Sequence, residues 1–149
     1  RKVYSLDIYG PVDPGEDEVW FTELKKHFDD SICYKGNAPF DKSVEILSGY
    51  FALLFPTQYY TEGIPGTIID SYAAGVPVIS ARWKSYSDVI IENETGLGYD
   101  FNTNSEFESI LDKIIDNPNK IIRLKENCIK KAECFLPENA IKPLFNRIK

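Results

Sequence analysis

The hydrophobic pattern of this chain alternates between two periods, and this alternation limits the fold more than any other feature. Short apolar runs suited to strands occur at residues 2–9, 31–35, 51–55, 76–81 and 97–101. Between them, apolar residues recur every three to four positions, as on one face of a helix. Strands that alternate with helices indicate a parallel sheet covered by helices on both faces. We therefore expect one α/β domain.

The helical stripes set the expected positions of the helices. The first stripe contains Trp20, Leu24, His27 and Phe28, which predicts that His27 is buried or half-buried. Further helical segments are expected around 40–47, from Pro65-Gly66 to Gly75, at 85–91, around 107–114 and 121–135, and at 139–148. The tail after Pro137 is the one candidate for an element that packs elsewhere.

Composition excludes several classes of function. The 17 basic and 23 acidic residues give a formal net charge of −6, which argues against binding nucleic acid by phosphate neutralisation. The apolar runs are shorter than the roughly 18–20 residues of a membrane span. The three cysteines, Cys33, Cys128 and Cys134, lack metal-site spacing and have one histidine to join them, so no metal site is expected. Unpaired thiols favour a reducing compartment, the cytoplasm.

The chain contains no Met and begins at Arg1. A complete translated sequence starts with Met, and Arg is a poor second residue for initiator removal. We therefore expect a piece of a longer protein, cut at its N-terminal side.

One loop carries the candidate chemistry. In parallel sheets, ligands bind beyond the carboxyl ends of the strands, and the loop after residues 51–55 contains Glu62, Gly63 and Gly66. The two glycines allow close approach to the backbone, and the free amides at 66–68 suit a phosphate. Glu62 and Asp70 flank that position, and carboxylates bind sugar hydroxyls well. This combination predicts a nucleotide-sugar site. Asp70 alone, placed on the first turn of the helix, would be better explained as a capping or solvated charge that suits the helix dipole.

The run F-P-T-x-Y-Y-T-E-G-I-P-G-T-I-I-D-S-Y-A-A-G-V-P-V-I-S-A, at residues 55–81, resembles the signature of retaining glycosyltransferases of family 4. Their hallmark is Glu, seven residues, Glu, then a helix and A-x-G-x-P-V-[IV]; here Asp70 stands in the second position, shorter by one methylene. Similar segments at 7–11, 34–36 and 87–97 extend the resemblance over nearly the whole chain. Within the family, the likeness is greatest to bacterial capsule and lipopolysaccharide sugar transferases.

The resemblance implies a fold and a set of roles. Residues 1–149 would be the nucleotide-sugar-binding C-terminal domain of a two-domain GT-B enzyme, with a Rossmann-like parallel sheet. Glu62 would contact the donor sugar as the catalytic residue, and Asp70 would hold the ribose hydroxyls. The remaining donor contacts would be backbone groups of Gly63, Ile64, Gly66 and Thr67 at the sugar and distal phosphate, and of Asn37 and Ala38 at the base. No metal or cofactor is expected.

The resemblance also implies missing parts. The first strand of the domain, with the family's basic pair, would precede Arg1, and so would the N-terminal acceptor domain. In the order 3-2-1-4-5-6, the strands at 2–9 and 51–55 would then lack a shared neighbour. Direct pairing, a second copy or upstream residues could fill the gap, and we favour upstream residues. The chain alone is expected to be inactive.

Several alternatives stay open. A sugar-nucleotide epimerase of the same fold, or an inactive nucleotide-sugar-binding module, would share these features. Tyr59, Tyr60 and Trp83 could stack on a ligand or pack within loops. The cationic stretch at 125–131 could touch an acidic membrane surface, where lipid-linked acceptors lie, but the interleaved acidic residues favour a solvated face.

Overall fold

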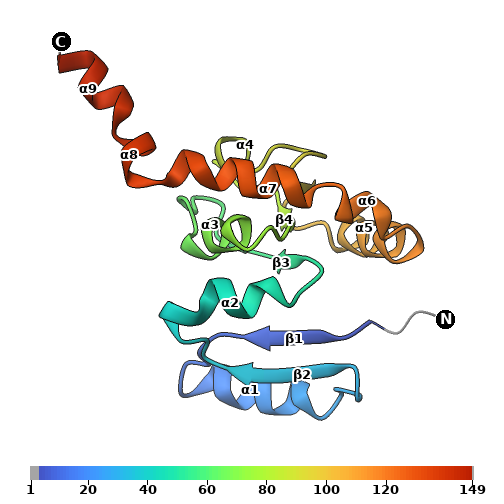
Figure 1. The fold of residues 1–149 in the computed structure, drawn as a ribbon. Coiled ribbons are helices and arrows are strands. Elements are labelled where there is room, and N and C mark those ends of the chain that lie inside the picture. Colours follow the sequence, from blue (N-terminus) through green and yellow to red (C-terminus); the bar gives the residue numbers. More distant parts are fainter. Residues whose placement is uncertain (1–3, 149) are drawn as a thin grey trace. The chain divides into compact units, whose positions relative to one another are not determined.

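The computed structural model describes residues 4–148 (Figure 1). The strands are β1 (Leu6–Tyr9), β2 (Ile32–Gly36), β3 (Leu53–Phe55), β4 (Val78–Ala81) and β5 (Gly96–Tyr99). The helices are α1 (Glu16–Lys25), α2 (Ser43–Ser48), α3 (Gly66–Ala73), α4 (Tyr86–Val89), α5 (Asn104–Asp116), α6 (Asn119–Ile122), α7 (Lys125–Ala132), α8 (Pro137–Ala140) and α9 (Lys142–Ile148), with 3-10 turns η1 (Phe40–Lys42) and η2 (Glu133–Phe135). Strands and helices alternate as far as α5, which confirms the α/β fold class.

The chain divides into two compact units, residues 1–42 and 43–149. In the first unit β1 and β2 are parallel, with Leu6 opposite Ile32. In the second unit the parallel order is β3-β4-β5, with Leu53 opposite Val78 and Ile79 opposite Leu97. The pair β1-β2 and the order β3-β4-β5 agree with the parts of the predicted order 3-2-1-4-5-6 that flank its strand 1. The presence of strand 1 itself stays a prediction.

In the first unit, α1 packs on β2 through aromatic rings. The Phe21 ring lies 4.8 Å from that of Tyr34 and 6.2 Å from that of Phe28, both edge-on. Of the predicted stripe, Leu24 and Phe28 are half-buried, but Trp20 is 64% exposed and Phe21 takes its place. The burial predicted for His27 is wrong, since α1 ends at Lys25 and His27 is exposed in the turn that follows.

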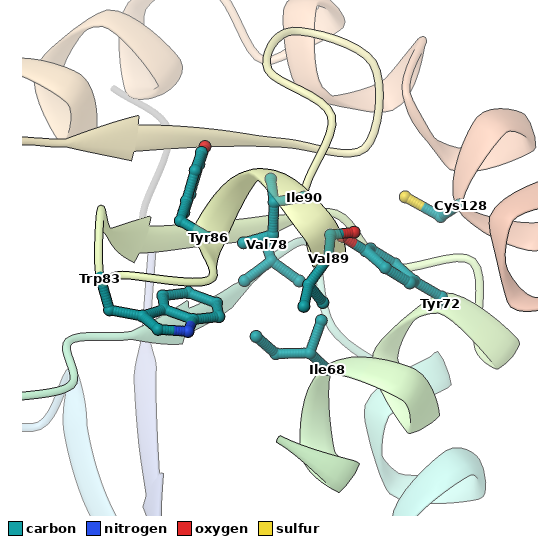
Figure 2. Close-up of a cluster of buried hydrophobic side chains, with 8 residues drawn as sticks. All are labelled: Ile68, Tyr72, Val78, Trp83, Tyr86, Val89, Ile90 and Cys128. Atoms are coloured by element: carbon teal, nitrogen blue, oxygen red, sulfur yellow. The ribbon is translucent and has the colours of Figure 1, made fainter. Parts of the chain in front are cut away.

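The core of the second unit has two clusters, one on each face of β4. Figure 2 shows the first cluster, in which side chains of α3, β4, α4 and α7 converge around Val78. The neighbouring Ile79 points to the opposite face and belongs to the second cluster, with Leu97 and Ile114. The predicted coverage of both faces is therefore confirmed for this sheet.

The end of α3 is fixed by a glycine. Gly75 has a φ of +68°, and its N–H donates to the Tyr72 carbonyl at 2.9 Å. The N–H of Val76 donates to the Ser71 carbonyl at 2.8 Å, which completes a Schellman motif. This motif turns the chain directly from α3 into β4.

The C-terminal segment is more broken than its pattern predicted. The stripe expected over 121–135 forms α6, α7 and η2 in succession. Beyond Pro137, α8 and α9 replace one short helix, and residues 142–148 are all exposed. The apolar side chains Leu144, Phe145 and Ile148 are among them. Packing of this tail against another element stays a prediction.

Candidate functional site

The loop between β3 and α3 is held from within and from the segment after β4. The N–H of Glu62 donates to the Tyr59 carbonyl at 3.1 Å, which makes a tight turn. The N–H of Lys84 donates to the Tyr60 carbonyl at 2.9 Å. The indole N–H of Trp83 donates to the Gly63 carbonyl at 3.3 Å. The segment after β4 therefore holds the loop at Tyr60 and Gly63, on either side of Glu62.

Of the loop aromatics, Trp83 packs within the protein. Its side chain is 3% exposed and meets the rings of Phe55 at 6.0 Å and Tyr86 at 5.6 Å. Tyr60 packs edge-on against Phe101 at 5.4 Å. Tyr59, by contrast, is 76% exposed. Packing therefore holds for Trp83, whereas stacking on a ligand stays a prediction for Tyr59 and for Tyr60, which is 54% exposed.

The start of α3 presents free backbone donors. The N–H of Ile68 bonds to the Pro65 carbonyl at 3.0 Å, whereas those of Gly66 and Thr67 have no acceptor within the described part of the chain. A Cβ built on Gly63 or Gly66 would meet no atom within 4 Å, and neither glycine has a positive φ. Open space therefore lies in front of both glycines, as a ligand close to the backbone would require.

The two acidic residues stand in different settings. Glu62 is half-buried in the loop before α3, and Ile64 beside it is 54% exposed. Asp70 is the fifth residue of α3, and no acidic residue lies in the helix's first turn. The placement of Asp70 in the first turn was therefore wrong by one position, and the helix dipole accounts for it less well.

Asp70 has a partner that the sequence pattern did not reveal. The hydroxyl of Ser43, the first residue of α2, donates to Oδ2 of Asp70 at 2.6 Å. The two residues are 27 positions apart, and α2 packs directly on α3. Their contact depends on tertiary packing, so no local pattern could have predicted it.

Asn37 and Ala38 follow β2 in the first unit. Asn37 is exposed and lines a cavity of about 340 Å³, together with Pro11 and Tyr34. The Tyr34 hydroxyl donates to the Gly10 carbonyl at 2.7 Å, which holds the turn after β1. Ala38 is half-buried and does not line the cavity. Asn37 therefore borders a concave surface at the carboxyl ends of β1 and β2.

A second cavity, of about 430 Å³, lies along β5 and α5, away from the glycine loop. Arg82 lines it and pairs with Asp100 at 3.0 Å and Glu92 at 3.4 Å. The Glu92 carboxylate also accepts bonds from the Gly98 N–H and the Tyr86 hydroxyl. Arg82 is therefore occupied with ion pairs at this sheet edge.

The cysteines are unpaired, with Cys33 and Cys134 exposed and Cys128 buried. Burial raises the pKa of the Cys128 thiol to about 12. Among residues 4–148, no three His, Cys, Asp or Glu side chains gather as metal ligands would. Within the same range, no helix has the length and apolarity needed to cross a membrane.

Comparison with known proteins gives a family match and several similar structures. Residues 1–133 match the model of the family described as glycosyl transferases group 1. No curated protein sequence matches the chain. Among solved structures, HepE from Anabaena in complex with UDP has a TM-score of 0.80 at 13% identity, covering 97% of this chain and 40% of HepE.

Two further structures give similar values. Sucrose-phosphate synthase from Thermosynechococcus elongatus has a TM-score of 0.77 at 18% identity, with 97% of this chain and 37% of that chain covered. HepE in complex with UDP-glucose has a TM-score of 0.73 at 14% identity, with 86% and 35% covered. The chain thus spans between a third and two fifths of these structures, and the likeness shows the fold.

Proposed function

The chain belongs to the family of glycosyl transferases group 1, and from this premise we propose that it is the donor-binding C-terminal half of a retaining glycosyltransferase. The enzyme transfers a sugar from a nucleotide sugar to a hydroxyl group and keeps the anomeric configuration. In this proposal the enzyme belongs to family 4 and acts in bacterial capsule or lipopolysaccharide synthesis. Its acceptor is a saccharide or a lipid-linked sugar.

One observation carries the proposal: the open glycine backbone at the start of α3. Neither Gly63 nor Gly66 has a positive φ, and a Cβ at either position would clash with no neighbouring atom. The fold alone therefore does not require glycine at these two positions. Glycine still costs conformational entropy on folding, so its use here requires another reason. A ligand phosphate in contact with the free amides of Gly66 and Thr67 supplies that reason.

The surrounding residues divide the donor between them. Glu62 accepts hydrogen bonds from the sugar hydroxyls, and Asp70 accepts them from the ribose. The base contacts are assigned in this proposal to backbone groups of Asn37 and Ala38. Support for this class of donor comes from HepE, whose structures hold UDP and UDP-glucose. In this account the donor is a substrate, and no cofactor takes part.

Charge on the departing diphosphate is stabilised without a metal in this proposal. The helix amides supply part of the stabilisation, because they are fixed dipoles aimed at the developing charge. The compared structures extend well beyond the part that this chain covers, and in this proposal the rest of the enzyme supplies further basic side chains and the domain that binds the acceptor. The unpaired cysteines support a cytoplasmic location.

A thermal-shift screen of the full-length protein against nucleoside diphosphates and nucleotide sugars tests this function. A ligand at 100 times its Kd stabilises the folded state by about 2.7 kcal/mol, and the melting temperature rises accordingly. We expect one base to give the largest shift, both as a diphosphate and as a sugar conjugate. The exposed-residue variant Glu138→Gln should show the same shift. No shift with any of these ligands would contradict the proposal.

A further inference from the structure

The hydrogen bond between Ser43 and Asp70 joins two helices beside the candidate donor site. Ser43 Oγ lies 2.6 Å from Asp70 Oδ2, a short distance typical of a hydroxyl that donates to a carboxylate. Both side chains are half-buried, so solvent competes only in part for this contact. The bond uses one oxygen of the carboxylate, and no donor within residues 4–148 bonds to the other oxygen, Oδ1.

Orientation matters for Asp70 because its side chain is short. An aspartate carboxylate can occupy several staggered positions about the Cα–Cβ bond. A charge-assisted hydrogen bond to one oxygen selects a single position, and the other oxygen then has a fixed direction. Such a fixed acceptor binds a hydroxyl pair with less loss of side-chain entropy.

We propose that Ser43 is a positioning residue that holds the Asp70 carboxylate for the ribose hydroxyls of the donor. This inference rests on the proposed function, since it requires Asp70 to bind ribose. It adds a residue from α2 that is not among those predicted for the site from the sequence. Ser43 acts through Asp70 and does not itself touch the sugar.

The chain offers variants that separate this role from helix packing. Ser43→Ala removes the hydroxyl, and Ser43→Thr keeps it. Ser48→Ala is the matched control, because Ser48 lies on the same helix and its hydroxyl bonds to the Glu45 carbonyl. Asp70→Ala removes the carboxylate, and the double variant Ser43→Ala/Asp70→Ala completes a mutant cycle.

The measurement is calorimetric binding by the full-length protein of the ribonucleoside diphosphate selected in the screen, and of its 2′,3′-dideoxy analogue. We expect Ser43→Ala to weaken ribonucleotide binding on the order of 5- to 10-fold, about the contribution of one ordinary hydrogen bond, because Ser43 acts on the ligand only through Asp70. It should leave the dideoxy analogue unaffected, because that ligand lacks the hydroxyls. In the Asp70→Ala background, the further change Ser43→Ala should not alter ribonucleotide binding. In the otherwise unchanged protein, Ser43→Thr should bind the ribonucleotide as tightly as the wild type. In the full reaction the donor KM should rise while kcat changes little.

The outcomes distinguish the inference from the function on which it rests. If Asp70→Ala weakens ribonucleotide binding and Ser43→Ala does not, the positioning role is wrong and the donor site stands. If Ser43→Ala weakens both ligands equally, or acts equally without Asp70, Ser43 only supports the packing of α2 on α3. If Asp70→Ala leaves ribonucleotide binding unchanged, Asp70 does not bind the ribose. The positioning role of Ser43 is then wrong, and so is the role of Asp70 in the donor site.

Discussion

Thr95 is a single, fully buried polar residue whose hydrogen bonds join separate segments of the second unit. Its hydroxyl accepts the N–H of Ile91 at 3.0 Å and lies 3.0 Å from the Tyr72 hydroxyl. Its carbonyl accepts the Cys128 thiol at 3.5 Å. The strand β5 is thereby connected to α3, to the segment after α4 and to α7. Burial also raises the pKa of the Tyr72 phenol, which stays a neutral partner.

Replacement of Thr95 by Val should destabilise the protein because valine has nearly the same shape but accepts no hydrogen bond. The N–H of Ile91 and the buried Tyr72 hydroxyl would both lose a partner, at a cost of about 1–3 kcal/mol. Urea unfolding of the full-length variant would measure this loss as a lower midpoint. Thr61→Val, at an exposed position, should leave the midpoint within experimental error. An unchanged midpoint for Thr95→Val would show that water or a rearranged neighbour serves Ile91.

Residues close in sequence were the ones that the pattern could predict. Glu62, Gly63, Gly66 and Asp70 fall within nine positions, so loop and helix periodicity alone brings them together. Ser43 reaches Asp70 only because α2 packs on α3. Glu92 appeared ordinary in the sequence, yet its carboxylate accepts the N–H of Gly98 at the edge of the sheet. Neither contact has a local signal.

The edge strand β5, at the scale of elements, depends on glycine. A Cβ on Gly98 would lie 2.6 Å from the Tyr86 hydroxyl oxygen and 2.9 Å from Cγ of Arg82. Tyr86 occupies this space because its hydroxyl donates to Glu92 at 2.8 Å. Glu92 in turn accepts the outward N–H of Gly98, which protects the edge from pairing with another strand.

Gly98→Ala should therefore displace Tyr86 and weaken the contact of Glu92 with the strand. Overpacking of this kind costs about 1–3 kcal/mol. Urea unfolding followed by Trp83 fluorescence, in a Trp20→Phe background, measures the second unit directly. Gly49→Ala is the matched control, because its added Cβ would meet only the Ile46 carbonyl oxygen at 3.5 Å. Equal midpoints for the two variants would contradict the assigned packing.

Trp83 should restrain the loop that carries Glu62. Trp83→Phe keeps an aromatic ring but removes the N–H that the Gly63 carbonyl accepts. We expect faster amide hydrogen exchange over residues 57–65, because exchange reports local opening of such segments. Trp20→Phe makes the same change at an exposed position and should leave exchange in this loop as it is. An unaltered loop in Trp83→Phe would show that other contacts hold it.

Elements were predictable where one periodicity dominates. The strands and the start of α3 follow from apolar runs and from Pro65-Gly66. The predicted buried face of α1 was wrong at Trp20. Val19, Trp20 and Phe21 are consecutive apolar residues, and one face of a helix cannot bury all three. Packing against Tyr34 selects Phe21. The breaks after α6 and α7 depend on such tertiary contacts as well.

At the scale of the whole molecule, the two units differ in burial. Among residues 4–148, all the buried residues belong to the second unit. We expect the amides of β1 and β2, in the isolated chain of residues 1–149, to exchange faster than those of β4 and β5. Protection follows local burial and contact density. Hydrogen exchange with mass spectrometry would measure this, and equal protection of the two sheets would contradict it.

We propose that Glu62 and the start of α3 form the donor site of a retaining transferase. Proton NMR of the full-length protein with its selected nucleotide sugar and acceptor follows the reaction directly. We predict a nucleoside diphosphate and a new anomeric signal of the donor's configuration. Glu62→Gln should react roughly 10²-fold more slowly, in the range lost with one preorganised polar partner, and bind the diphosphate as before. Inverted product, an epimerised donor or wild-type turnover in Glu62→Gln would contradict this account.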